Sequence, residues 1–142
     1  MDFFSSMDIS ASALAAQRTR MNLISSNLAN VNSTKTAEGG PYKRKDAVFT
    51  ATDAPGSFGD ALGKAAARGV EVTQIMEDPN PPRLQYDPTH PDANPQGYVA
   101  YPNINVVEEM ADMITASRSY EANVTASNAA KNMALKTLEL GR

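Results

Sequence analysis

Apolar positions in the first part of the chain recur at spacings of three, four and seven residues, the heptad pattern of a helix with a narrow apolar seam. No glycine or proline interrupts this pattern, which predicts a helix from about Ser5 to Val31. Polar Ser10 and Gln17 interrupt one row of the seam, so the seam is mixed. We expect it to comprise Met7, Leu14, Met21, Ile24, Leu28 and Val31.

A second helical pattern occupies the end of the chain, from about Asn105 to Leu140. Asn105 is a good N-cap residue at its start. Glu108, Glu109 and Asp112 follow and suit the positive end of a helix dipole. A glycine after the last periodic residue is typical of a helix C-terminus. The predicted seam of this helix comprises Val106, Met110, Met113, Tyr120, Val124 and Leu138.

The residues between these two patterns have a different composition. They contain all nine prolines of the chain, seven of them within residues 79–102, and this density argues against a helix or a central strand. Val70–Ile75 is rich in β-branched residues and is the best strand candidate, with Arg83–Tyr86 as its expected hairpin partner. Tyr42–Thr50 is a weaker strand candidate, and residues 51–68 fit either a short helix or a loop.

The sequence therefore predicts a mainly α protein with long N- and C-terminal helices and a small irregular middle that contains a β-hairpin. Its expected parts are residues 1–33, with the first helix, residues 34–103, which are proline-rich, and residues 104–142, with the second helix. Because one side of a two-helix pair always faces solvent, the narrow seams predict helices that are marginal in an isolated chain. Neighbouring copies would stabilise them, and a monomeric helical hairpin is the alternative.

Composition and charge exclude several classes of function. The 142 residues carry 13 Lys and Arg against 16 Asp and Glu, and this net charge of −3 argues against a nucleic-acid-binding protein. The chain has no cysteine and one histidine, which excludes thiolate metal sites, disulfides and paired-histidine motifs. No apolar run approaches the roughly 20 residues of a membrane span, and the N-terminus lacks the pattern of a secretory signal. The basic run Lys43-Arg44-Lys45 fits a solvated segment or a contact with an acidic neighbour.

Candidate catalytic residues are few. His90-Pro91-Asp92 matches the tripeptide of J-domain co-chaperones, but neither flank is helical and no basic helix precedes it. Asp87, His90 and Asp92 are also a candidate metal or acid–base cluster, although such residues in a proline-rich stretch more often form turns. No nucleophile, base and orienting group occur together, so we expect neither an enzyme nor a cofactor, metal or small-molecule substrate.

The residues from Leu23 to Ser33 closely resemble the N-terminal signature of bacterial flagellar axial proteins, the family of rod, hook and hook-associated proteins. In that family an Asn-apolar-small-Asn step ends the N-terminal helix, and the matching residues here are Asn27, Leu28, Ala29 and Asn30. Later stretches resemble the proximal-rod members of the family, namely residues 72–79, 81–84, 86–88, 90–94, 97–103, 105–110, 117–123 and 135–138.

The resemblance implies a non-enzymatic subunit of the flagellar basal-body rod. In this family the terminal helices pair as a coiled coil, and many copies with other rod proteins form a hollow helical shaft that transmits torque and lines the export channel. It also implies passage to the periplasm through the flagellar type III export apparatus, without signal-peptide cleavage and without membrane insertion. Asn27 and Asn30 are expected to cap or cross-link the end of the first helix through side-chain hydrogen bonds.

A short Phe-x-x-x-apolar signal for the export gate is also typical of this class. Phe58 and Leu62 fit that pattern and are the candidate export signal. Phe3 to Met7 fits the same loose pattern. The alternative for Phe58 and Leu62 is a small hydrophobic anchor in the middle segment.

A rival interpretation of the helical pattern is a cytosolic helical-hairpin adaptor or chaperone. It predicts a stable helical oligomer of low order at micromolar concentration. The rod interpretation predicts weak helicity in the dilute monomer and a rise in helicity on polymerisation, and circular dichroism distinguishes the two.

A charge placed in either predicted seam should abolish assembly, because burying an unpaired carboxylate is costly. We expect Leu14→Asp and Val124→Asp each to prevent rod formation and motility, scored by swimming and by the presence of the protein in isolated basal bodies. Normal rods and motility in such variants would contradict the seam assignment.

Overall fold

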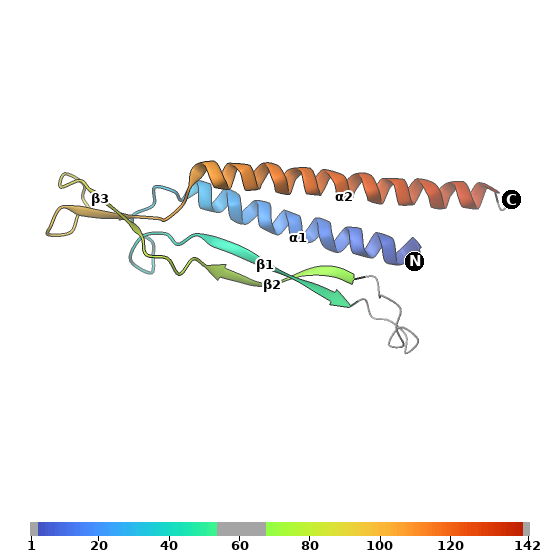
Figure 1. Ribbon diagram of the computed structural model, residues 1–142, viewed down its shortest axis with the longest axis horizontal. Helices are drawn as coiled ribbons and strands as arrows, with labels where there is room; N and C mark the ends of the chain where they lie inside the picture. Colours follow the sequence, from blue (N-terminus) through green and yellow to red (C-terminus); the bar gives the residue numbers. More distant parts are fainter. Residues whose placement is uncertain (1–2, 54–67, 141–142) are drawn as a thin grey trace.

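The computed structural model describes residues 3–53 and 68–140 of an elongated molecule (Figure 1). Two helices, α1 (Phe3–Ala29) and α2 (Val106–Leu140), run antiparallel along its length. The middle of the chain forms two antiparallel strand pairs from β1 (Lys45–Asp53), β2 (Arg68–Glu77), β3 (Arg83–Tyr86) and β4 (Tyr98–Tyr101). The expected class, mainly α with a β-containing middle, is confirmed.

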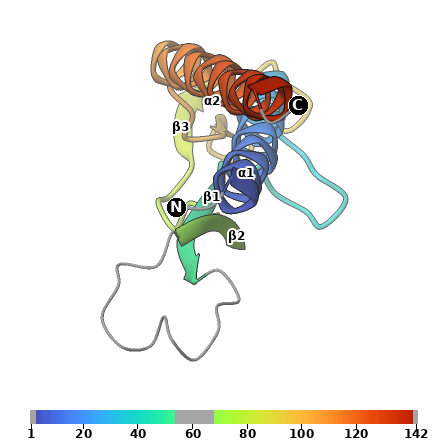
Figure 2. The same cartoon turned by 90° about the vertical axis from the view of Figure 1, so that its right-hand side faces the viewer.

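The long elements form three layers. α2 lies on one side of α1, and the ribbon of β1 and β2 lies on the other side (Figures 1 and 2). The ribbon pairs from Lys45 opposite Glu77 to Asp53 opposite Arg68, with one irregularity after Val48. The β3–β4 pair projects beyond the helices at the end of the molecule where α1 ends and α2 begins (Figure 1). This end therefore brings together the connection from α1 to β1, the connection from β2 to β3 and the connection from β4 to α2.

Asn105 begins α2 in the way its sequence position indicates. Its side-chain oxygen Oδ1 accepts a hydrogen bond from the backbone N–H of Val107 at 3.2 Å. Its carbonyl accepts the bond of the Glu109 N–H at 3.0 Å. Both contacts satisfy groups that a helix start leaves unpaired, so the predicted N-cap is confirmed.

α1 ends at Ala29, two residues before the expected Val31, and Asn30 follows its last residue. The backbone N–H of Asn30 approaches the Ser26 carbonyl at 3.1 Å, and its side-chain amide donates to the same carbonyl at 2.9 Å. The hydroxyl of Ser33 donates to Asn30 Oδ1 at 3.1 Å, which holds the chain in a turn. The predicted capping role of Asn30 is therefore confirmed.

The predicted hairpin between Val70–Ile75 and Arg83–Tyr86 is wrong. β2 pairs with β1, which contains much of the weaker candidate Tyr42–Thr50, and β3 pairs with β4. The connection from β2 to β3 has three prolines within residues 78–82, and proline fixes φ and lacks the N–H that a tight antiparallel turn would use. The true partner of β2 lies across residues 54–67, so the local pattern did not indicate it.

The core of the molecule is thin. Few apolar residues among those described are buried, three of them are alanines and none is aromatic, and they are Ala16, Ile24, Val99, Pro102, Ile104, Ala116 and Ala130. The chain exposes 10204 Å², whereas a compact monomer of 15.2 kDa would expose about 7,100 Å². The isolated subunit therefore presents a large surface for further contacts.

The connection from β3 to β4 depends on Gly97. Its φ is +84°, and a Cβ at this position would lie 2.9 Å from Cε2 of Tyr86. Its carbonyl accepts the N–H of Asp87 at 2.9 Å, and Asn94 Oδ1 accepts the N–H of Tyr98 at 2.8 Å. The missing side chain leaves room for the Tyr86 ring to meet Tyr98 edge to face, with centroids 5.3 Å apart.

Replacement of this glycine should loosen the β3–β4 pair. We expect Gly97→Ala to destabilise it by about 1–3 kcal/mol, because a left-handed backbone strain adds to the clash with Tyr86. Gly39→Ala is the matched control, since Gly39 has φ +87° but nothing lies within 4 Å of its Cβ position. Amide hydrogen exchange across Tyr98–Tyr101 measures the difference, and equal protection in the two variants would contradict the role assigned to Gly97.

Candidate functional site

A buried carboxylate at the start of α2 organises the polar contacts between the layers. Glu109 is 1% exposed, and Asn27 of α1 is also 1% exposed. Asn27 Nδ2 donates to Glu109 Oε2 at 3.1 Å, and Arg44 Nε donates to Glu109 Oε1 in an ion pair. Burying a carboxylate without partners is costly, because the charge loses its contacts with water. The hydrogen bond from Asn27 and the ion pair with Arg44 offset this cost.

Asn27 joins three segments through one side chain. Its Nδ2 donates to the carbonyl of Lys45 at 2.9 Å, and its Oδ1 accepts the Lys45 N–H at 3.0 Å. The same Oδ1 accepts the hydroxyl of Tyr42 at 3.1 Å. The amide thus satisfies both backbone groups of the first residue of β1, and the predicted cross-linking role of Asn27 is confirmed. We call Asn27, Tyr42, Arg44, Lys45 and Glu109 the Glu109 cluster.

Arg44 supplies the charge that balances Glu109. Partial burial lowers the pKa of Arg44, but the hydrogen bond and the charge of Glu109 outweigh this effect, so the pKa lies above its ordinary value. Arg44 also lies 3.7 Å from a carboxylate oxygen of Asp46 and 3.9 Å from one of Asp112. Arg20 of α1 approaches Asp112 at 3.7 Å. Arg44 therefore stays charged at physiological pH and supplies the positive charge opposite Glu109.

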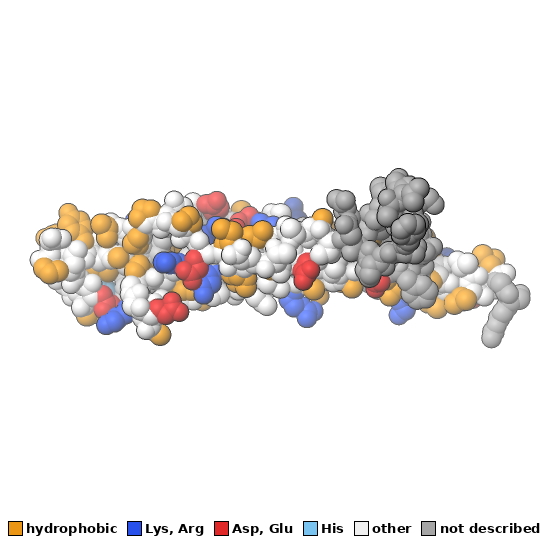
Figure 3. Space-filling model, turned by 90° about the horizontal axis from the view of Figure 1, so that it is seen from below, with side chains coloured by type: hydrophobic (Ala, Val, Ile, Leu, Met, Phe, Trp, Pro, Cys, Tyr) orange, Lys and Arg blue, Asp and Glu red, His pale blue; other side chains and the backbone are white. Residues whose placement is uncertain are grey.

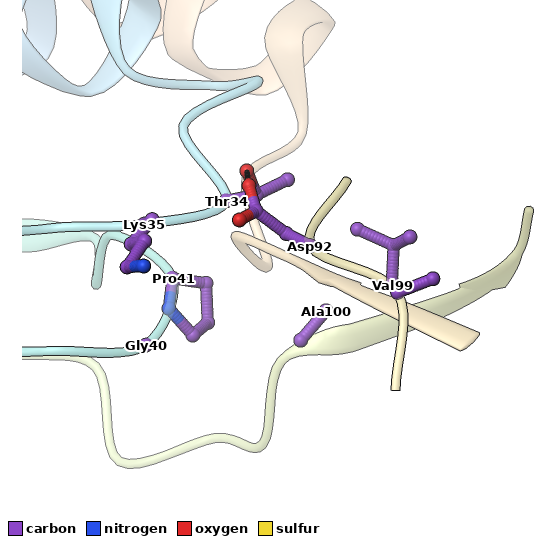
Figure 4. Close-up of a pocket in the computed structure, with 8 residues that line it drawn as sticks. Thr34, Lys35, Gly40, Pro41, Asp92, Val99 and Ala100 are labelled. Atoms are coloured by element: carbon purple, nitrogen blue, oxygen red, sulfur yellow. Dashed lines mark hydrogen bonds between the residues drawn. The ribbon is translucent and has the colours of Figure 1, made fainter. Parts of the chain in front are cut away.

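A second junction ties the segment after α1 to the turn before β4. Thr34 Oγ1 donates to Asp92 Oδ2 at 2.8 Å beside a hollow of about 330 Å³ (Figure 4). The hollow is lined by Thr34, Lys35, Gly40, Pro41, Asp92, Ala93, Val99 and Ala100. The contact between the Thr34 and Asp92 side chains therefore fixes the β3–β4 pair to the end of α1.

The candidate cluster of Asp87, His90 and Asp92 forms turns. His90 Nδ1 accepts the N–H of Asp92 at 3.1 Å. Asp87 Oδ1 accepts the hydroxyl of Thr89 at 2.7 Å and its N–H at 3.1 Å, and these bonds hold the pKa of Asp87 below its ordinary value. In the described part of the chain, no three His, Cys, Asp or Glu side chains group closely enough to hold a metal ion.

The predicted seam residues of α1 all lie at least partly out of solvent. Ile24 is 5% exposed, and its neighbours along the helix are partly buried. The partly buried positions are Met7, Leu14, Met21 and Leu28, together with Val31 just beyond the end of α1. The apolar row of α1 is therefore at least partly buried within the subunit.

The predicted seam residues of α2 divide into two groups. Met113, Tyr120 and Val124 are partly buried. Other positions lie outside the α1–α2 contact, and these are Val106, Met110 and Leu138 with exposed fractions of 41%, 55% and 71%. The side chains of α2 buried against α1 are instead Glu109, Ala116 and Ala130.

Large apolar side chains remain exposed at both ends of α2. The helix has 35 residues against 27 in α1, and its last turns extend past the start of α1 (Figure 1). Neither described helix has the length of apolar sequence that a membrane span requires. The exposed residues are Val106, Val107, Met110, Ile114, Met133, Leu135, Leu138 and Leu140.

The candidate export signal, Phe58 and Leu62, lies outside the described residues. The glycine expected to stop the second helix also lies outside them.

Sequence reasoning missed the burial of Glu109, because an acidic residue in a first helical turn is ordinarily solvated. The basic residue Arg44, in a run with two lysines, was the one signal that pointed to an acidic partner.

Two family models match the two helical regions of the chain. The family described as Flagella basal body rod protein matches residues 7–35, which hold most of α1. The family described as Flagellar basal body rod FlgEFG protein C-terminal matches residues 96–140, which hold β4 and α2. The layered pair of terminal helices is thus the part of the fold that defines the class, a protein of the flagellar rod type.

Curated relatives narrow the class. The chain is 45% identical to the flagellar basal-body rod protein FlgC of Bacillus subtilis (strain 168), over all of both chains. It is 46% identical to the FlgC protein of Escherichia coli O157:H7, over 95% of each chain, and 45% identical to that of Borreliella burgdorferi, over 94% of this chain and 93% of the relative. The chain therefore belongs to the FlgC family of flagellar basal-body rod proteins. This membership favours the rod interpretation over a cytosolic adaptor or chaperone.

Removal of the buried carboxylate should destabilise the subunit, because Arg44 and Asn27 would lose their shared partner. We expect Glu109→Ala to lower the free energy of unfolding by roughly 3 kcal/mol, as when one partner of a buried ion pair is deleted. Glu108→Ala, an exposed carboxylate in the same turn, is the matched control and should change it by less than about 0.5 kcal/mol. Urea unfolding followed by circular dichroism measures both, and equal small losses would contradict a stabilising role for the Glu109 cluster.

Proposed function

We propose that this chain, a structural subunit of the flagellar basal-body rod and not an enzyme, polymerises with copies of itself and with other rod proteins. The observation that carries the proposal is the set of large apolar side chains exposed along α2, from Val107 at 75% to Leu140 at 87%. Full burial of one such side chain stabilises by about 1.5–3 kcal/mol. Neighbours that cover these residues would therefore favour the assembled form strongly.

The terminal helices supply the assembly surface. In this proposal α1 and α2 pair as a coiled coil within one subunit, and the remaining faces of both helices meet neighbouring subunits. Exposed small residues permit close approach of a neighbouring helix, and they are Ala11, Ala15, Ala122 and Ala126. The seam residues that lie outside the α1–α2 contact, Val106, Met110 and Leu138, become contacts between subunits.

The assembled subunits form a hollow helical shaft in the proximal rod, which transmits torque across the periplasm and surrounds the export channel. The resemblance to flagellar axial proteins and the membership of the FlgC family support this placement. The chain crosses the flagellar export apparatus without cleavage, with Phe58 and Leu62 as its candidate signal. The thin, alanine-rich core supports this route, because a small core costs little to unfold for passage.

A negative charge on the projecting end of α2 should block incorporation without unfolding the subunit. We expect Leu138→Glu to remove the protein from isolated basal bodies and to abolish swimming, because Leu138 is 71% exposed in the subunit and would be buried between subunits. Asn132→Glu adds the same charge at an exposed polar position and is the matched control, expected to swim. Far-ultraviolet circular dichroism should be equal for the two purified variants, and normal swimming of Leu138→Glu would contradict the proposal.

A further inference from the structure

Gln17 is a polar residue on a side of α1 that is otherwise buried. It lies between Ser10 and Ile24 at heptad spacing, so the three residues share one side of the helix. Ser10 and Ile24 are 9% and 5% exposed. Gln17 is itself partly buried, and its side-chain oxygen Oε1 is fully buried. Among the described residues, this oxygen is the buried side-chain atom that has no hydrogen-bond partner.

The charged donors nearest to Gln17 in the sequence are engaged with α2. Arg18 Nη2 donates to the hydroxyl of Tyr120 at 3.5 Å, and Arg20 pairs with Asp112 at 3.7 Å. These two contacts place this turn of α1 beside residues 112–120 of α2. Neither arginine donates to the Gln17 oxygen.

Gln17 and Asn27 have opposite effects on the packing of α1. Both ends of the Asn27 amide form hydrogen bonds within the Glu109 cluster. A buried acceptor without a partner gives up its hydrogen bond to water and gains none in exchange, so it lowers stability. Polar side chains on the outside of the molecule stay hydrated and carry no such cost, and many lie on the face that carries the β1–β2 ribbon (Figure 3). Gln17 therefore weakens the packing of α1, whereas Asn27 strengthens it.

We propose that Gln17 is a weak point built into the helix pair, which keeps the isolated subunit easy to unfold for passage through the export apparatus. This inference rests on the proposed function, in which the chain crosses that apparatus before it assembles. Because few apolar residues are buried, one unpaired acceptor removes a large share of the net stability. Met7 and Met21 lie partly buried on α1, so an unbranched apolar side chain suits this helix.

Gln17→Met in the purified full-length chain tests the weak point. Methionine is unbranched and has a helix propensity similar to that of glutamine, so the change removes the amide and little else. We expect amide hydrogen-exchange protection across residues 13–21 to rise by about tenfold. Gln74→Met, the same change at an exposed position of β2, is the matched control and should alter it by less than about twofold. Unchanged or lower protection in Gln17→Met would overturn the inference.

Export of the same variants tests the consequence for function. Each variant replaces the chain in cells, and the loss of pulse-labelled chain from the cytoplasm is followed with time. We expect Gln17→Met to leave several-fold more slowly than the unmodified chain, because fewer molecules are unfolded at any moment, and Gln74→Met to leave at the normal rate. Normal export of Gln17→Met despite its higher protection would also contradict the weak point.

A compensating substitution separates stability from direct recognition of residue 17. Ile24→Val removes one methylene from a buried position in the same row and shifts the unfolding equilibrium by up to about tenfold. In the double variant Gln17→Met and Ile24→Val, we expect protection and export both to return toward those of the unmodified chain. Slow export with restored protection would show that the export apparatus reads residue 17 directly, and the weak point would then be wrong.

The outcomes distinguish this inference from the proposed function. Failure of the unmodified chain to leave the cytoplasm or to appear in basal bodies would overturn both. Normal export and incorporation of the unmodified chain, together with any of the contrary results above, would overturn the role of Gln17 alone.

Discussion

The carboxylate of Glu109 lies in the first turn of α2, and the residue is only 1% exposed. A charge in that position requires partners, and they come from Asn27 of α1 and from Arg44 just before β1. These contacts therefore fix how α1, α2 and the β1–β2 ribbon are aligned along the molecule. Asn27 adds hydrogen bonds to the first residue of β1. The apolar contacts between the helices are mainly alanines, which specify register weakly, so this polar cluster carries the specificity that a larger core would supply.

The small amount of apolar surface buried between the layers also leaves the subunit with surface that can contact neighbours. The β1–β2 ribbon packs close to α1 where Gly69 meets Ser12, and the hydroxyl of Ser12 accepts the N–H of Val70 at 3.2 Å. These contacts position the ribbon without burying much apolar surface. The outer side of α2 and its last turns are exposed to solvent. The subunit is therefore held together by polar contacts at the end where α1 ends and α2 begins, whereas much of the apolar surface of α2 is uncovered. In the proposed assembly, neighbouring subunits cover the surface that the chain leaves exposed.

The sequence predicted those features that local patterns encode. Both long helices, the N-cap Asn105 and the bonding roles of Asn27 and Asn30 follow from spacing, side-chain chemistry and the axial signature. The pairing of β2 could not be predicted, since its partner lies beyond residues 54–67 and the nearer candidate is separated by prolines. The burial of Glu109 could not be predicted either, because its partners are 65 and 82 residues away in the chain. The division of the predicted α2 seam into partly buried and exposed residues also depends on contacts between segments far apart in the sequence.

Hydrogen exchange on the isolated subunit and on intact basal bodies compares the two states of the chain directly. The account predicts that amides near Glu109 are protected in both samples, whereas amides of residues 131–140 exchange freely in the isolated subunit and become protected in the basal body. Equal protection of residues 131–140 in the two samples would contradict the claim that neighbouring subunits complete the fold.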